Sequence, residues 1–111
     1  MLRVENITTD PDQSHTIDFL DNPVAMRIRY IATRKFWYMD INYNGLNVLG
    51  IKCVVGVALL KNNNFPFDIA INDDSGNGVD PFRLEDMAQR MSIYIAEPDD
   101  MAAIRGFRVE L

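Results

Sequence analysis

The stretch FWYMDINYNGLNVLGI, residues 36–51, contains the only tryptophan of the chain and a turn that can be identified from its residues alone. Asn44-Gly45 is the strongest short signal for a β-hairpin, because both central residues of a type I′ turn need a positive φ, which these two tolerate best. Residues 36–43 alternate between two faces, one of which carries Trp37, Met39, Ile41 and Tyr43. The stretch therefore predicts two antiparallel strands, 36–43 and 46–51.

The same period of two extends on both sides of this hairpin. Residues 24–31 alternate and are separated from residue 36 by the polar turn 33–35, so they predict an antiparallel partner for residues 36–43. Ile17 and Phe19 share one face of an earlier strand, and residues 65–72 and 91–96 predict two more strands. The run IKCVVGVALL is too uniformly apolar to assign, so residues 50–62 stay open.

One short helix interrupts this pattern of strands. Asp80-Pro81 reads as an N-cap followed by proline at the first helical position, which predicts a helix through about Gln89. The fold class we predict is mainly β, a small antiparallel β-barrel or rolled sheet with one short α-helix. The domain plan is an N-terminal arm at 1–13, a β domain at 14–98 and a C-terminal extension at 99–111, whose IRGFRVEL segment can add an edge strand.

Composition narrows the function classes. A chain of 111 residues with 48% apolar content is expected to form one domain. Its 11 Lys and Arg against 16 Asp and Glu give a net charge of −5, which disfavours nucleic-acid binding. No apolar run approaches the roughly 18 residues that cross a bilayer, and the N-terminus lacks the apolar segment of a signal peptide. We therefore expect no membrane segment and synthesis in the cytoplasm.

No residue pattern points to catalysis or to a cofactor. His15 is the only histidine and has no evident partner, so it reads as a surface residue. Cys53 is the only cysteine, cannot form an internal disulfide, and lies in an apolar run typical of a small buried side chain. A nucleophilic Cys53 would need a base such as His15 brought close by the fold. We expect no enzyme, no catalytic residue and no cofactor.

The loop DDSGNG, residues 73–78, partly matches the start of a calcium-binding EF-hand loop. Asp73, Ser75 and Asn77 occupy its first, third and fifth positions, and a glycine follows at the sixth. The twelfth position is Leu84 instead of the bidentate glutamate, and the preceding residues predict a strand. Turns between strands commonly use Asp, Asn, Ser and Gly. We expect no metal site, with this loop as the one weak candidate.

The aromatic residues allow two interpretations. Trp37, Tyr38 and Tyr43 could form a platform for a sugar or another ligand, as in a small carbohydrate-binding β-barrel. Their alternation instead divides them between two faces, and strands recruit aromatic side chains for the core. The predicted core consists of Trp37, Met39, Ile41 and Tyr94.

The order of these segments resembles the phage contractile-tail baseplate plug family, known from a cyanophage tail. The resemblance covers about residues 14–98 and rests on RIRY, FWYMDI, the Asn-Gly turn, LNVLGIKCVVGVALL, FPFDIAI and VDPFRLEDMAQRMSIYIAEPDD. It implies a structural virion protein of the tail baseplate, associated with the hub at the distal end of the tail tube. It implies as partners the hub, the spike, the tail tube and further copies of the chain, in a homotrimer on the tail axis. Free sheet edges would suit assembly by strand addition.

Overall fold

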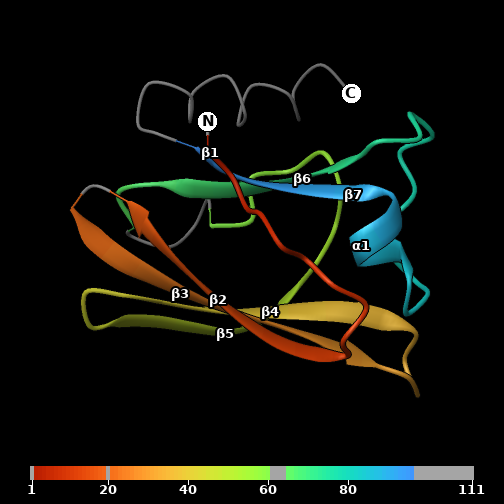
Figure 1. Ribbon diagram of the computed structural model, residues 1–111, viewed down its shortest axis with the longest axis horizontal. Coiled ribbons are helices and arrows are strands. Elements are labelled where there is room, and N and C mark those ends of the chain that lie inside the picture. Colours follow the sequence, from red (N-terminus) through yellow and green to blue (C-terminus); the bar gives the residue numbers. More distant parts are fainter. Residues whose placement is uncertain (1, 20, 61–64, 97–111) are drawn as a thin grey trace.

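The structure is a computed structural model that describes residues 2–19, 21–60 and 65–96. In these ranges the chain forms two antiparallel sheets that face each other, with a single helical turn at one end (Figure 1). The elements are β1 Leu2–Arg3, β2 Asp12–Phe19, β3 Asn22–Ile31, β4 Phe36–Tyr43, β5 Leu46–Lys52, β6 Asp68–Asp73, α1 Asp86–Gln89 and β7 Met91–Ala96.

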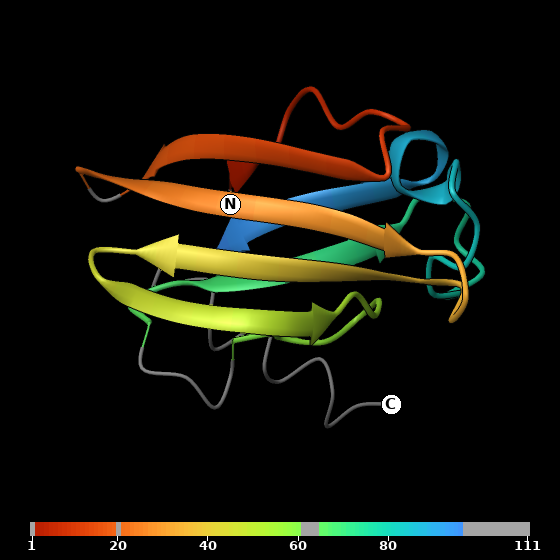
Figure 2. The same cartoon turned by 90° about the horizontal axis from the view of Figure 1, so that it is seen from below.

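The first sheet has the order β2-β3-β4-β5, so each strand pairs with its neighbour along the chain (Figure 2). Met26 lies opposite Ile41 and Tyr30 lies opposite Trp37. The predicted Asn44-Gly45 turn joins β4 to β5, with φ values of 50° and 83°. This register places the apolar residues of β3 and β4 on one face, where both strands bury them.

The second sheet has the order β1-β7-β6. The sequence left residues 50–62 unassigned. Of these, residues 53–60 run in turns beside the outer edge of β6. The amide of Gly56 donates to the carbonyl of Ile71 at 3.0 Å, and the amide of Leu59 donates to that of Ile69 at 2.9 Å. Residues 61 and 62 lie outside the described ranges. The outer edge of β6 is therefore covered by the chain itself.

The core lies between the two sheets. Fully buried apolar side chains fill it, and the largest are Trp37, Phe67, Met26, Ile28, Met39, Ile41, Leu60, Ile69, Ile71, Met87, Ile93 and Ile95. Aromatic rings pack at both ends of the core. Near the Asn44-Gly45 turn, Phe67 contacts Tyr43 and Phe19 edge to face, and at the other end Trp37 packs on Tyr30. The prediction of a mainly β, antiparallel fold is confirmed, with an open two-sheet sandwich in the described residues instead of a closed barrel.

The helix is shorter than predicted. It begins at Asp86, not after Asp80, and Glu85 precedes it without a side-chain cap. Residues before it are held in a turn because the Asp86 carboxylate accepts the amides of Phe82 and Arg83, both at 2.9 Å. Their carbonyls accept hydrogen bonds from the first sheet, as described below, which keeps this segment out of a regular helix.

The segment expected as an N-terminal arm, 1–13, packs on the domain from residue 2 onward. Leu2 and Arg3 pair with β7, and Val4 is buried in the core. The side chain of Gln13 is buried and closes the preceding turn, because its Nε2 donates to the carbonyls of Thr8 and Asp10. The expected C-terminal extension, 99–111, lies outside the described residues.

Tyr94 was expected in the core but is only partly buried. The alternation along β7 turns Ile93 and Ile95 toward the first sheet, and Tyr94 lies between them on the opposite face. The other predicted core residues, Trp37, Met39 and Ile41, are fully buried.

Replacing Trp37 by phenylalanine tests how the two sheets are joined. The indole Nε1 of Trp37 donates to the carbonyl of Arg83 at 3.0 Å, and phenylalanine loses this bond and part of the buried volume. We expect the free energy of unfolding to fall by about 2–3 kcal/mol, measured by urea denaturation. Tyr38→Phe, on the outer face, is the control and should change it by less than about 0.5 kcal/mol. Equal effects of the two variants would contradict this role of Trp37.

Candidate functional site

Residues 79–85, which we call the 79–85 loop, precede α1 at one end of the sandwich (Figure 1). Two aromatic side chains of the first sheet hold its backbone. The Tyr30 hydroxyl donates to the carbonyl of Phe82 at 3.1 Å, and Trp37 donates to that of Arg83. The loop is thereby tied to β3 and β4, although its neighbours in sequence belong to the second sheet.

Arg90 holds the same loop from the other side. Its guanidinium donates to the carbonyls of Val79 at 2.6 Å and Asp80 at 2.8 Å. It also forms ion pairs with the carboxylates of Asp73 and Asp86, both at 3.1 Å. The Arg90 side chain is mostly buried, and both carboxylates are almost completely buried. Paired charges in such a position orient the groups around them, because leaving one unpaired is costly.

The pKa values of both carboxyl groups reflect these contacts. The Ser75 hydroxyl and the Val79 amide, with Arg90, lower the pKa of Asp73 to about 2. Burial acts to raise the pKa of Asp86, but Arg90 and the amides of Phe82 and Arg83 outweigh it and bring the value to about 2. Both groups are therefore ionised at neutral pH and keep the network intact.

The 79–85 loop presents apolar side chains to solvent despite this rigid backbone. Six large apolar side chains are exposed among the described residues, and half of them belong to this loop: Val79, Phe82 and Leu84. A rigid loop with exposed apolar side chains loses little conformational freedom when it binds a partner. The loop is therefore a candidate surface for contact with another protein.

The outer face of the first sheet is the second candidate surface. Arg27 forms a bidentate pair with Asp12, at 2.8 and 2.7 Å, and Arg29 pairs with Asp40 at 3.0 Å. Asp40 also accepts the amide of Gly50 at 2.8 Å, where β5 bulges away from β4. The φ of Gly50 is 72°, a conformation that glycine adopts without strain.

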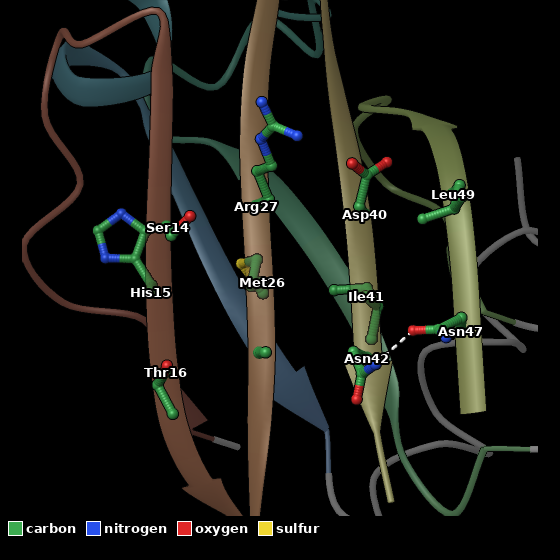
Figure 3. Close-up of a pocket in the computed structure, with 11 residues that line it drawn as sticks. Ser14, His15, Thr16, Met26, Arg27, Asp40, Ile41, Asn42, Asn47 and Leu49 are labelled. Carbon is green, nitrogen blue, oxygen red and sulfur yellow. Dashed lines mark hydrogen bonds between the residues drawn. The ribbon is translucent and has the colours of Figure 1, made fainter. Parts of the chain in front are cut away.

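A hollow of about 150 Å³ opens on this outer face (Figure 3). Ala25 of β3 and Leu49 of β5 are the exposed apolar residues at this hollow, whereas the side chains of Met26 and Ile41 beneath it are buried in the core. Arg27 and Asp40 stand beside one another at one side of the hollow, and Asn42 donates a hydrogen bond to Asn47 at another. Ala25 is the smallest of the lining residues, and its exposed side chain leaves this space open between longer neighbours.

The structure places His15 and Cys53 in different surroundings. His15 is half-buried at the edge of β2, where its Nε2 lies 2.8 Å from the side-chain oxygen of Gln13, and burial lowers its pKa. Cys53 is fully buried, which raises the pKa of its thiol and disfavours the reactive thiolate. The two residues have no contact that would make them a nucleophile and its base.

The DDSGNG loop uses its first carboxylate for its own turn. Asp73 accepts the amide of Ser75 at 3.0 Å, its hydroxyl at 2.6 Å and the amide of Val79 at 2.9 Å, in addition to pairing with Arg90. Ser75 and Asn77 are exposed. Within the part of the chain that the structure describes, no three His, Cys, Asp or Glu side chains are placed to hold a metal ion.

The three aromatic residues considered as a ligand platform do not share a surface. Trp37 and Tyr43 are buried between the sheets, whereas Tyr38 lies half-buried on the outer face. A stacking platform needs exposed rings on one side of a sheet. Trp37, Tyr38 and Tyr43 therefore do not form the shared platform that a carbohydrate-binding module built on these residues would need.

The contacts that shape the 79–85 loop were not predicted from the sequence. Asp86 and Arg90 stand four residues apart, a spacing that indicates an ion pair on a helix. Nothing in the sequence connects this pair to Asp73 or to Trp37, because these contacts join segments brought together by the packing of the two sheets.

Acid titration tests the Arg90 network. A carboxylate whose pKa is lowered in the fold stabilises it above the unfolded pKa of 3.8, and this stabilisation is lost as the pH falls to about 2. We expect the urea midpoint to fall steeply between about pH 4 and about pH 2. Asp73→Asn and Asp86→Asn should lower the midpoint at neutral pH and flatten its fall in acid. Asp12→Asn, in an exposed pair with Arg27, is the control and should leave the curve nearly unchanged.

The helix of the described residues, α1, is neither long enough nor apolar enough to cross a membrane.

Comparisons with known proteins place the chain in a family. A search of curated proteins finds no match. The family model described as "Cyanophage baseplate Pam3 plug gp18" matches residues 1–98 of the 111. This match includes residues 1–13, which pack on the domain, and it confirms the resemblance found in the sequence. The chain therefore belongs to the cyanophage baseplate plug family and is a structural component of a phage tail baseplate.

Proposed function

We propose that this protein is a plug subunit associated with the hub at the distal end of the tail tube. The family match over residues 1–98 is the observation that carries this proposal. The role is structural and not catalytic, and its place is the tail baseplate of the virion. Synthesis in the host cytoplasm and the absence of nucleic-acid binding stay predictions from the sequence.

The two candidate surfaces suit such a role. A baseplate subunit must contact neighbours in a defined orientation, which favours rigid surfaces over flexible ones. The 79–85 loop is held by Tyr30, Trp37 and Arg90. The outer face of the first sheet carries paired charges of both signs, which can orient a partner protein.

Two of the four sheet edges, those of β5 and β6, are protected from strand addition. Residues 53–60 cover the edge of β6, and the bulge at Gly50 interrupts the edge of β5. A bulge or a covering segment protects an edge from pairing with another chain. The partners we propose are the hub, the spike, the tail tube and further copies in a homotrimer on the tail axis. They would not pair with these two edges, which leaves the loop and the outer face as surfaces for side-chain contact.

Immunogold labelling of purified virions tests the location. We expect an antibody raised against this protein to label the distal end of the tail. The matched control is a phage without this gene. Its virions should lack the label and should regain it when the protein is supplied from a plasmid. Gold label on the head would contradict the proposal. So would the absence of label both on intact particles and on particles with the tail tip opened.

Light scattering tests the partners. The purified protein mixed with the hub protein of the same phage should give a complex with the summed mass of its components. The double variant Arg27→Glu with Asp12→Lys keeps an ion pair on the outer face but exchanges the positions of its positive and negative charges. It should weaken the complex if this face contacts the partner. Absence of a complex with the hub, spike and tube proteins alike would exclude the proposed hub association.

A further inference from the structure

One side of the sandwich keeps two open sheet edges. β1 is the outermost strand of its sheet, and β2 is the outermost strand of the other sheet (Figure 2). Within the described ranges, β2 pairs with β3 alone, so the other edge of its backbone has no neighbouring strand. A hollow of about 370 Å³ lies between the two edges. It is lined by Leu2, Arg3, Glu5 and Asn6 on one side and by residues 15–18 on the other.

The inner face of β2 is incompletely covered at this hollow. Alternate residues of β2 point inward, namely Gln13, His15, Ile17 and Phe19. The first and the last of them are buried, whereas His15 and Ile17 are only partly buried. Ile17 packs against the core and also lines the hollow. The space therefore suits a strand whose inward side chains are apolar.

The charges at the hollow are available to such a strand. Arg3, Glu5 and Asp18 are exposed, and none of them belongs to an ion pair of the described residues. On the outer face, by contrast, Arg27 and Asp40 are already paired with other side chains of the sheet. The hollow thus presents two carboxylates and one guanidinium that an added strand can pair with.

Residues 104–111, with the sequence IRGFRVEL, have the pattern that this edge requires. Every second residue from Phe107 to Leu111 is apolar, and Arg108 and Glu110 lie between them, so a strand would have one apolar and one charged face. The two arginines and one glutamate of this segment complement the one arginine and two carboxylates at the hollow.

The segment is attached to the chain beside the hollow. β7 ends at Ala96, and its neighbour Ile95 pairs with Leu2, which lines the hollow. An extended chain over residues 97–103 spans up to roughly 23 Å, whereas paired strands lie only about 4.8 Å apart. A tether of this length keeps the segment at a local concentration of roughly millimolar. This favours the segment of the same chain over that of another copy.

We propose that residues 104–111 pair with the open edge of β2 in the same chain, as an antiparallel strand with Arg108 opposite Asp18. This register places Val109 opposite Ile17 on the inner face. Arg108 and Asp18 then form a cross-strand pair of opposite charge on the outer face. The added strand protects the edge of β2 from pairing with another protein. The inference goes beyond the proposed function, because it concerns a contact within one chain.

Cysteine crosslinking of the full chain tests this pairing. Asp18→Cys with Arg108→Cys places two thiols on opposite residues, whose Cα atoms lie about 4.5–5.5 Å apart in paired strands, within the span of a disulfide. Under mild oxidation at micromolar concentration we expect an intramolecular disulfide, detected by mass spectrometry as a crosslinked peptide of a monomeric chain. Cys53 does not compete, because it is fully buried.

A second pair of cysteines controls for chance collisions of the segment with the domain. Asn77 is exposed in the loop after β6, at the end of the sandwich where Asp73 pairs with Met91 and not at the end where Asp68 pairs with Ala96. Asn77→Cys with Arg108→Cys should therefore crosslink at least about tenfold more slowly.

Substitutions on the two faces of the segment test the register. Val109→Asp, added to the chain with cysteines at 18 and 108, puts a charge against Ile17 and should slow the crosslink at least about tenfold. Glu110→Gln, on the outer face, is the control and should leave the rate unchanged. If the Asp18→Cys chain fails to fold by circular dichroism, Thr16→Cys with Glu110→Cys replaces it, because Thr16 is exposed and opposite Glu110 in the same register.

Three outcomes would overturn the proposal. The first is a disulfide that joins two copies, which would indicate exchange of the segment between chains. The second is a crosslink no faster than that of the Asn77 control, and the third is a crosslink that Val109→Asp does not slow. The location in the baseplate is tested separately by gold labelling, so either inference can fail while the other holds.

Discussion

The Arg90 guanidinium, held between the carboxylates of Asp73 and Asp86, is the interaction on which one end of this molecule depends. Asp73 ends β6, Asp86 begins α1, and Arg90 directly precedes β7, so one side chain connects three consecutive elements. The remaining hydrogen-bond donors of Arg90 bind carbonyls of the 79–85 loop. Mostly buried charges need all of these partners, and this requirement permits few arrangements of the loop.

The position of the loop has a direct consequence for the surface of the protein. Since its polar backbone groups are satisfied by Tyr30, Trp37, Asp86 and Arg90, its apolar side chains need not turn inward to stabilise it. They remain exposed at one end of the sandwich. On the other side of the first sheet, diagonal ion pairs and the small side chain of Ala25 border a hollow among charged and polar side chains. Rigidity and exposure thus coexist, as a subunit that assembles by surface contact requires.

Much of the fold could be predicted because the strands of the first sheet are local in sequence. The alternation in residues 24–31 and 36–43 and the Asn44-Gly45 turn specify the pairing and the register without reference to the rest of the chain. The helix is shorter than predicted because the Asp80-Pro81 signal is local, whereas the side chains that divert residues 81–85 come from β3, β4 and Asp86. Tyr94, predicted to lie in the core, is only partly buried because alternation along β7 turns it to the opposite face from Ile93 and Ile95.

By itself the sequence determined the antiparallel hairpins and the burial of Trp37, Met39 and Ile41, because each depends on residue types at short spacing. The order of its segments over residues 14–98 carried the resemblance to the family. Only the tertiary structure decided which surfaces are available for contact. The covering of β6 by residues 53–60, the attachment of the 79–85 loop to Trp37 and Arg90, and the hollow over Ala25 all join residues far apart in the chain. Such contacts follow from how two sheets pack to bury their inner faces, and the local pattern of a strand carries no information about them.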